Sequence, residues 1–139
     1  MKKRNATAIW NGTGKEGTGN LSTHSSALNK VQYSYRDRFE EGVGTNPEEL
    51  MAAAHAGCFS MKLSFLLNAE GFTPDEIETR CDITLDPPVG ITMSELKCTA
   101  KVPGIDAAKF QEIAQKAKAE CPVSKAYGAI QITLNANLA

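Results

Sequence analysis

The chain has 139 residues, of which 42% are hydrophobic and 22% are charged, and its formal net charge at pH 7 is −1. A chain of this length and composition can bury one sizeable core, so we predict a single domain over residues 1–139. The balanced charge excludes the basic surface that is typical of nucleic-acid-binding proteins.

The chain begins with a basic segment, residues 1–7, that no long apolar run follows. We therefore expect neither a signal peptide nor a membrane anchor, and we place the protein in the cytoplasm. The next thirty residues predict three β-strands, at 7–10, 20–23 and 31–35, separated by Gly-rich or polar turns. Aromatic and polar residues alternate from Tyr33 onward, so a continuation of the third strand would place Arg36 and Arg38 on one face.

The following segment has a clear helix start. Asn46 can cap the helix, Pro47 fits its first position, and Glu49 can reach back to the cap. Apolar residues then continue on nearly all sides to about Ala69, and Gly71 can end the helix. A helix of this kind is expected to be buried on most sides, in part by a partner subunit.

One stripe of this helix carries chemically different side chains. Glu48, His55, Cys58 and Lys62 lie within roughly 80° of one another on the helical wheel. These polar residues make a membrane span the poorer alternative. A helical cysteine is more often a small buried residue than a reactive one, and a histidine there is more often structural than catalytic. Lys62 could add positive potential or extend to solvent.

The segment after the helix predicts a long β-hairpin, with strands at 77–85 and 93–102 joined by residues 86–90. Cys81 and Cys98 fall in the apolar phase of these strands, so we interpret them as core thiols. A disulfide between them is disfavoured in a reducing compartment. The four cysteines of the chain contain no Cys-x-x-Cys pair, which argues against a zinc site.

A second helix starts at a predicted cap, Asp106, and its apolar residues recur with helical spacing from Phe110 to Cys121. Cys121 is therefore expected to point inward. Pro122 follows at once, so Cys121 can also begin a short new helix whose amides favour a thiolate. Alternating apolar residues from Ile130 predict a final strand.

Four segments taken together resemble the OsmC/Ohr family, the osmotically inducible and organic hydroperoxide resistance proteins. They are residues 38–40 (Arg-Phe-Glu), 44–50, 53–61 and 116–124. The resemblance covers nearly the whole chain. Its specific part is an Asn-Pro-Glu helix start that leads to Cys-Phe, combined with a downstream Cys-Pro-Val-Ser. The Arg-Phe-Glu segment and residues 102–106 resemble the OsmC branch more than the Ohr branch.

The resemblance implies a cysteine-based peroxidase that uses no metal and no flavin. In that family the cysteine that matches Cys58 is the peroxidatic thiol and the one that matches Cys121 is the resolving thiol. An arginine and a glutamate matching Arg38 and Glu48 line the site. The implied reaction reduces organic hydroperoxides, and more weakly hydrogen peroxide, to alcohols at the expense of an external thiol or dithiol of the dihydrolipoamide type. No nucleic acid or membrane is implied as a partner.

The chemistry of the residues agrees with these roles. Cys58 lies about a dozen residues into its helix, too far from the N-terminus to gain much from the helix dipole. A cation is therefore needed, unless the helix breaks at Gly57. Arg38 can stabilise the thiolate and orient the peroxide, while Glu48 can hold the guanidinium by a bidentate pair. Apolar neighbours, for which we expect Met51, Phe59 and Phe39, would favour an organic peroxide.

The spacing along the helix makes a further prediction. Glu48 precedes Cys58 by ten residues, which at about 1.5 Å per residue is roughly 15 Å along a straight helix. The two side chains cannot share a site within one subunit, but antiparallel packing of the helices of two chains would bring them together. We therefore predict a homodimer with two sites at its interface, in agreement with the intertwined dimers of the family.

The predicted fold is thus α+β and OsmC-like, with antiparallel sheets around a long buried central helix in an intertwined homodimer. Two other functions stay open at this point. One is a redox-responsive binding protein that is oxidised by peroxide without sustained turnover. The other is a non-catalytic dimer module in which all four thiols are equally inert.

Overall fold

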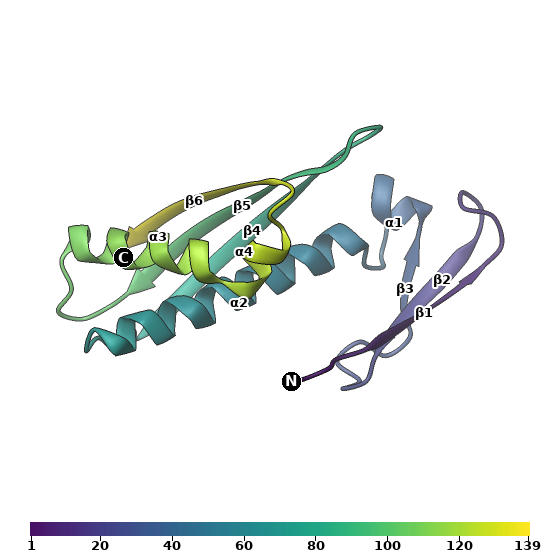
Figure 1. The fold of residues 1–139 in the computed structure, drawn as a ribbon. Coiled ribbons are helices and arrows are strands. Elements are labelled where there is room, and N and C mark those ends of the chain that lie inside the picture. Colours follow the sequence, from purple (N-terminus) through teal and green to yellow (C-terminus); the bar gives the residue numbers. More distant parts are fainter. The chain divides into compact units, whose positions relative to one another are not determined.

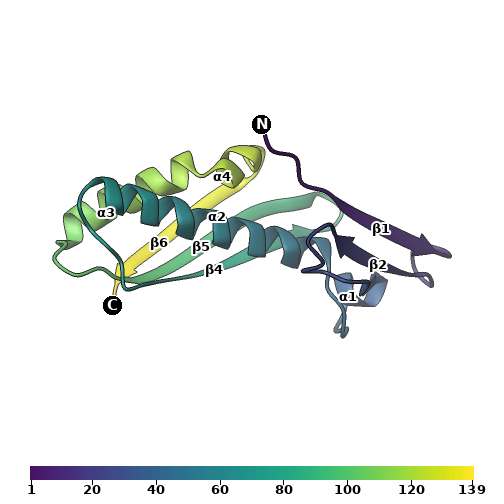
Figure 2. The same ribbon diagram turned by 90° about the horizontal axis from the view of Figure 1, so that it is seen from below.

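The computed structural model describes residues 1–139 as an α+β chain with six strands and four helices (Figures 1 and 2). The elements are β1 (Ala6–Asn11), β2 (Thr18–Thr23), β3 (Val31–Ser34), α1 (Tyr35–Phe39), α2 (Pro47–Ala69), β4 (Glu76–Asp86), β5 (Gly90–Lys101), α3 (Ala107–Glu120), α4 (Pro122–Ala126) and β6 (Gln131–Leu138). They form two compact units, Met1–Leu50 and Met51–Ala139. Each unit contains one three-stranded sheet.

The sheet of the first unit has the order β1-β2-β3, and both of its strand pairs are antiparallel. The three strands confirm the predicted ones to within a few residues. The third strand ends at Ser34 and does not continue, because Arg36 and Arg38 belong to α1, so the condition under which they would share a strand face is not met. Ser34 stops the strand because its side chain caps the helix, accepting from the Asp37 N–H over 3.2 Å.

Asp37 fixes the loop between α1 and α2. Its carboxylate accepts from the Ser34 hydroxyl over 2.7 Å and from the Gly44 N–H over 2.8 Å. A Cβ at Gly44 would clash with the backbone of Gln32, so the close approach of this loop requires glycine. Asn46 donates to the Asp37 carbonyl oxygen over 3.0 Å and, as predicted, caps α2 by accepting from the Glu49 N–H over 2.8 Å.

α2 begins at Pro47 and ends at Ala69, and Gly71 follows with a φ of 88°, as the sequence predicts. Its inner face is fully buried through Phe59, Leu63 and Leu67. Within the single chain its burial is one-sided, because Met61 and Phe65 are 64% and 66% exposed, and the expected cover by a partner subunit stays a prediction. The chain packs α2 only from the side of its own core, which α2, α3, β5 and β6 form together.

By length and composition alone, α2 is also apolar enough to cross a membrane, a property that core helices share. Two of its polar residues have protein partners. His55 is fully buried and hydrogen-bonded at both ring nitrogens. Lys62 forms an ion pair with Glu120 over 3.1 Å. These contacts are those of a core helix.

The second sheet has the order β4-β5-β6, and α2 and α3 lie together on one of its faces (Figures 1 and 2). β4 and β5 form the predicted antiparallel hairpin. The prediction of antiparallel sheets is wrong for β6, which pairs parallel to β5. The connection between these strands contains both α3 and α4, so it is long enough to return the chain to the starting end of the sheet.

The cysteines of the hairpin are free thiols. Cys81 lies opposite Leu96, and Cys98 lies opposite Thr79, so the two cysteines are diagonal neighbours and not a directly opposed pair. Cys98 is buried, as predicted for a core thiol, whereas Cys81 is half-buried.

The Asp37 contacts predict a specific response to acid. Hydrogen bonds from the Gly44 N–H and then the Ser34 hydroxyl lower the pKa of Asp37 below its usual value of 3.8. A carboxyl with a depressed pKa stabilises the fold above its unfolded pKa, and this contribution is lost as the pH falls through the folded pKa. We expect the stability difference between the parent chain and Asp37→Asn to shrink as the pH falls from about 6 to about 2.

The measurement is the free energy of unfolding by urea at each pH. Asp86→Asn, which alters an exposed aspartate at the end of β4, is the matched control and should show no such trend. A difference for Asp37→Asn that stays constant over the whole pH range would contradict the assignment.

Candidate functional site: a hydrogen-bonded pair of thiols

Two cysteines that are 63 residues apart in the sequence meet in the second unit. The Cys121 thiol donates to the Cys58 sulfur, with 2.8 Å between the two Sγ atoms. Cys58 lies on α2 and is half-buried, while Cys121 is fully buried between α3 and α4. Both are free. The structure therefore brings these two predicted site residues together.

Cys121 is held at the junction of two helices. Its N–H donates to the Ala117 carbonyl oxygen over 2.9 Å, which closes the last turn of α3. Its carbonyl oxygen accepts from the Lys125 N–H over 3.1 Å, which opens α4, with Pro122 at the first position. Because Phe110 and Ala117 bury the same face of α3, the thiol that follows them in phase also points into the core.

The surroundings of Cys58 push its pKa in opposite directions. Burial raises the pKa, and so does the proximity of the second sulfur, while the Val123 N–H and the Lys62 ammonium lower it. The net direction is upward. The sequence assigned the favourable amides of α4 to Cys121, whereas in the structure the Val123 N–H lowers the pKa of Cys58. The second unit thus supplies only part of what a stable thiolate needs.

A pocket of about 240 Å³ opens beside Cys58. Its other lining residues are Met61, Lys62, Phe65, Glu120 and Pro122. Phe59, which we expected among the apolar neighbours, is fully buried in the core instead. Met61 and Phe65 take its place because they follow Cys58 by three and seven residues and so share its side of the helix. That spacing is a signal that sequence reasoning could have used.

Arg38 and Glu48, the other predicted site residues, also lie together, within the first unit. The Arg38 Nε and Nη2 atoms both donate to Oε1 of Glu48, over 3.0 and 2.8 Å. The expected bidentate pair therefore uses one carboxylate oxygen only. Oε2 of Glu48 is buried and has no hydrogen-bond partner. The pairing holds the guanidinium in one orientation while leaving its Nη1 group free to donate elsewhere.

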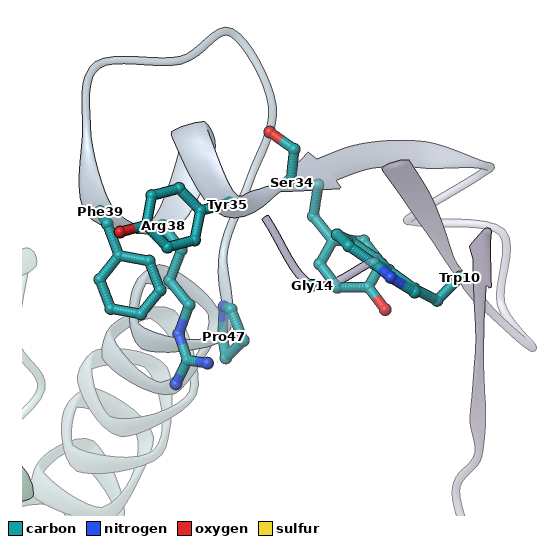
Figure 3. Close-up of a pocket in the computed structure, with 8 residues that line it drawn as sticks. Trp10, Gly14, Ser34, Tyr35, Arg38, Phe39 and Pro47 are labelled. Carbon is teal, nitrogen blue, oxygen red and sulfur yellow. The ribbon is translucent and has the colours of Figure 1, made fainter. Parts of the chain in front are cut away.

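A second pocket, of about 230 Å³, lies beside Arg38 and is shown in Figure 3. Its lining residues are Trp10, Gly14, Tyr33, Ser34, Tyr35, Arg38, Phe39 and Pro47. The Tyr35 and Phe39 rings are 4.7 Å apart, and the Arg38 guanidinium lies 5.3 Å from the centre of the Phe39 ring. Phe39, expected as an apolar neighbour, therefore lines the pocket next to the arginine.

His55 has the structural role that the sequence favoured. Its Nδ1 lies 2.6 Å from the Ser94 hydroxyl and its Nε2 lies 2.8 Å from the Ser124 hydroxyl. Burial lowers the pKa of His55, which keeps the ring neutral. Sequence reasoning missed both serines, because a serine 39 or 69 residues away carries no pattern that links it to this histidine. No group of three or more His, Cys, Asp or Glu side chains is placed to hold a metal ion.

The fold and this site define a small α+β protein with a hydrogen-bonded dithiol, one thiol of which opens to an apolar pocket. The family model described as "OsmC-like protein" matches residues 40–135. The chain is 51% identical to "Peroxiredoxin OsmC" of Escherichia coli strain K12 over 134 residues, 94% of this chain and 93% of the relative. The chain belongs to the OsmC family.

More distant relatives come from the Ohr branch. An "Organic hydroperoxide resistance protein" of Xanthomonas axonopodis pv. citri is 34% identical over 102 residues, 67% of each chain. The crystal structure of the organic hydroperoxide resistance protein OhrB of Bacillus subtilis matches with a TM-score of 0.68 and 25% identity, over 95% of this chain and 97% of that one. The higher identity to the Escherichia coli protein confirms the predicted OsmC branch.

The electrostatics of the dithiol yield a prediction for Lys62. Because its ammonium lowers the pKa of Cys58, Lys62→Met should raise that pKa and slow the alkylation of Cys58 several-fold at neutral pH. The rate of iodoacetamide addition to Cys58, followed by mass spectrometry across a pH series, measures the effect. Lys97→Met, which removes an exposed lysine paired with Asp82, is the control. Equal profiles for both variants would contradict the role of Lys62.

Proposed function

We propose that this protein is a cysteine-based peroxidase that reduces organic hydroperoxides, and more weakly hydrogen peroxide, to alcohols and water. In this proposal Cys58 is the attacking thiol and Cys121 is the resolving thiol. The observation that carries the proposal is the pair of free thiols at hydrogen-bonding distance beside an apolar pocket. The names of the relatives, a peroxiredoxin and organic hydroperoxide resistance proteins, support the same reaction.

The first step oxidises Cys58. Its thiolate attacks one oxygen of the peroxide, so that an S–O bond forms, the O–O bond breaks, and the departing alkoxide takes up a proton to become the alcohol. Cys121 then attacks the sulfur of the resulting sulfenic acid. The S–O bond breaks, a disulfide forms, and the hydroxide leaves as water with the proton of the Cys121 thiol. The thiols already touch, so this second step needs little displacement.

A reductant must then restore the two thiols. Each turnover delivers two electrons to the peroxide, so an external dithiol, or two equivalents of a thiol, must exchange with the Cys58–Cys121 disulfide. Cys121 is fully buried whereas Cys58 is half-buried, so the attack on the disulfide takes place at Cys58. A small dithiol of the dihydrolipoamide type fits an opening lined by Met61 and Phe65.

The same lining favours organic peroxides. Met61 and Phe65 flank Cys58 in the pocket and give the alkyl or aryl group of a hydroperoxide an apolar surface to bury. Burial of one phenyl-sized group contributes on the order of 2 kcal/mol, which hydrogen peroxide cannot gain. The preference for organic substrates therefore follows from the walls of the pocket and not from the thiol.

The proposed active form is a homodimer with two sites at its interface. Burial raises the pKa of Cys58 on balance, although the Lys62 ammonium lowers it, so the proposed site needs a further cation. Arg38, fixed by Glu48, is the proposed additional cation. α2 runs unbroken from Pro47 to Ala69, and ten residues of helix separate Glu48 and Cys58 by about 15 Å along the axis. Arg38 is therefore assigned to act on Cys58 of the partner subunit.

The exposed face of α2 supports this assembly. Met61 and Phe65 present a large apolar surface on one helix, which a second copy of the chain in an intertwined dimer would cover. A single OsmC-like domain over residues 1–139 belongs to the same proposal. So does a cytoplasmic location, where the four free thiols would stay reduced between turnovers.

The decisive experiment counts free thiols on the reduced protein before and after one equivalent of cumene hydroperoxide, beside hydrogen peroxide and beside Cys58→Ser and Cys121→Ser. We expect rapid loss of two thiols with the organic peroxide, a slower loss with hydrogen peroxide, no loss in Cys58→Ser, and a sulfenic acid without a disulfide in Cys121→Ser. Survival of all four thiols would contradict the proposal. Oxidation without turnover by any dithiol would identify a redox-responsive binding protein.

The dimeric site has its own test in purified heterodimers with two different tags. If Arg38 acts on the partner's thiol, the Arg38→Met/Cys58→Ser heterodimer keeps one intact site and roughly half of the parent rate. A heterodimer of the parent chain with a chain that carries both substitutions should then be inactive. The opposite pattern would place Arg38 and Cys58 of the same chain in one site, and two inactive heterodimers would exclude both arrangements.

A further inference from the structure

A chain of hydrogen bonds crosses the core next to the two thiols. His55, on α2, is fully buried and bonds to Ser94 of β5 on one side and to Ser124 of α4 on the other. Ser94 also lies 3.2 Å from the Cys81 sulfur. The Tyr127 ring packs edge-on against His55, with ring centres 5.2 Å apart.

The position of α4 depends on these hydrogen bonds. It has only five residues and no side-chain cap, and a single helical turn has little stability of its own. Ser124 is its one buried residue. The side-chain hydrogen bonds that join α4 and its C-cap to α2 are those of Ser124 with His55 and of the Tyr127 hydroxyl with the Met51 carbonyl oxygen, over 3.0 Å.

α4 in turn positions two groups that act on the Cys58 thiol. Cys121 immediately precedes this helix and Val123 is its second residue. The thiol of the first donates to the Cys58 sulfur, and the N–H of the second lowers the pKa of Cys58. A shift of α4 away from α2 would therefore withdraw the resolving thiol and the amide together.

We propose that His55 is a positioning residue, which through Ser124 holds α4 so that Cys121 stays in contact with Cys58 for the resolution step. The inference rests on the proposed peroxidase function. Both ring nitrogens already have partners, so the ring serves as a rigid link between β5 and α4 and not as a base. A neutral imidazole has one donor and one acceptor, and a serine hydroxyl can complement either, so the link is complete in both tautomers.

Loss of this link is expected to affect the two chemical steps to different extents. Attack on the peroxide needs Cys58 and its pocket, so loss of the link slows it only by the lost contribution of the Val123 amide. Resolution needs the Cys121 sulfur at contact distance from the sulfenic acid. A displacement of about 1 Å can slow such a step by up to about a hundredfold. A long-lived sulfenic acid would then react with a second peroxide to give a sulfinic acid.

The experiment compares Ser124→Ala with Ser60→Ala. Ser60 is the matched control, because it also lies on α2 and also joins that helix to another element, through a 2.7 Å hydrogen bond to Thr79 of β4. Each protein is mixed with one equivalent of cumene hydroperoxide, and dimedone trapping with mass spectrometry follows the Cys58 sulfenic acid over time. We expect Ser124→Ala to prolong its lifetime by about tenfold or more, while Ser60→Ala and the hydroxyl-retaining Ser124→Thr resemble the parent.

A second measurement needs no peroxide. In the reduced protein, Ser124→Ala should expose Cys121 to iodoacetamide and speed hydrogen exchange at the α4 amides, whereas Ser60→Ala should change neither. Parent-like protection of Cys121 in Ser124→Ala, or equal slowing of resolution by both alanine variants, would overturn the role of His55. Failure of the parent itself to form a sulfenic acid would instead overturn the proposed function, and the alkylation result would still decide the positioning role.

Discussion

The contact between Cys58 and Cys121 depends on the packing of α2 against α3 and not on the thiol hydrogen bond itself. Phe59 and Leu63 of α2 and Phe110 of α3 are all fully buried in one core. Each such side chain contributes on the order of 2 kcal/mol by leaving water, whereas a hydrogen bond contributes a net of about 1 kcal/mol, and one between thiols less. The hydrophobic core therefore sets the distance between the sulfurs, and the hydrogen bonds around His55 refine it.

The burial that holds the thiols together also opposes their ionisation. A thiol that leaves water loses the solvation of its charged form, and the pKa values of Cys58, Cys81 and Cys98 are all raised mainly for this reason. Only Cys58 has both an amide and a cation that counteract burial. The surroundings of Cys58 therefore differ from those of Cys81 and Cys98, although all three residues are cysteines.

Sequence reasoning found the features that local physics determines and missed those that depend on distant partners. The caps at Asn46 and Asp106 and the inward direction of Cys121 follow from short-range patterns, and the structure has all three. The α1 helix was missed because the alternation after Tyr33 suggested a strand, and the Ser34 side chain was not considered as a helix cap. Sequence reasoning missed the parallel pairing of β6 with β5 and the hydrogen bond between His55 and Ser124. Both depend on the path that the chain takes between residues far apart in the sequence.

The uniform apolarity of α2 reflects two packing surfaces on one helix. The face that carries Phe59 and Leu63 is completed by the core of the same chain, while the face that carries Met61 and Phe65 is left open by it. Cys58 lies on the helical wheel between the open face and His55. A thiol at that boundary depends on both surfaces. The inner surface fixes the position of Cys121 beside it, and whatever covers the outer surface determines its solvation. In the proposed dimer the chemistry of this thiol would depend on assembly, because covering the outer surface strengthens the electrostatic effect of any cation that arrives with the partner.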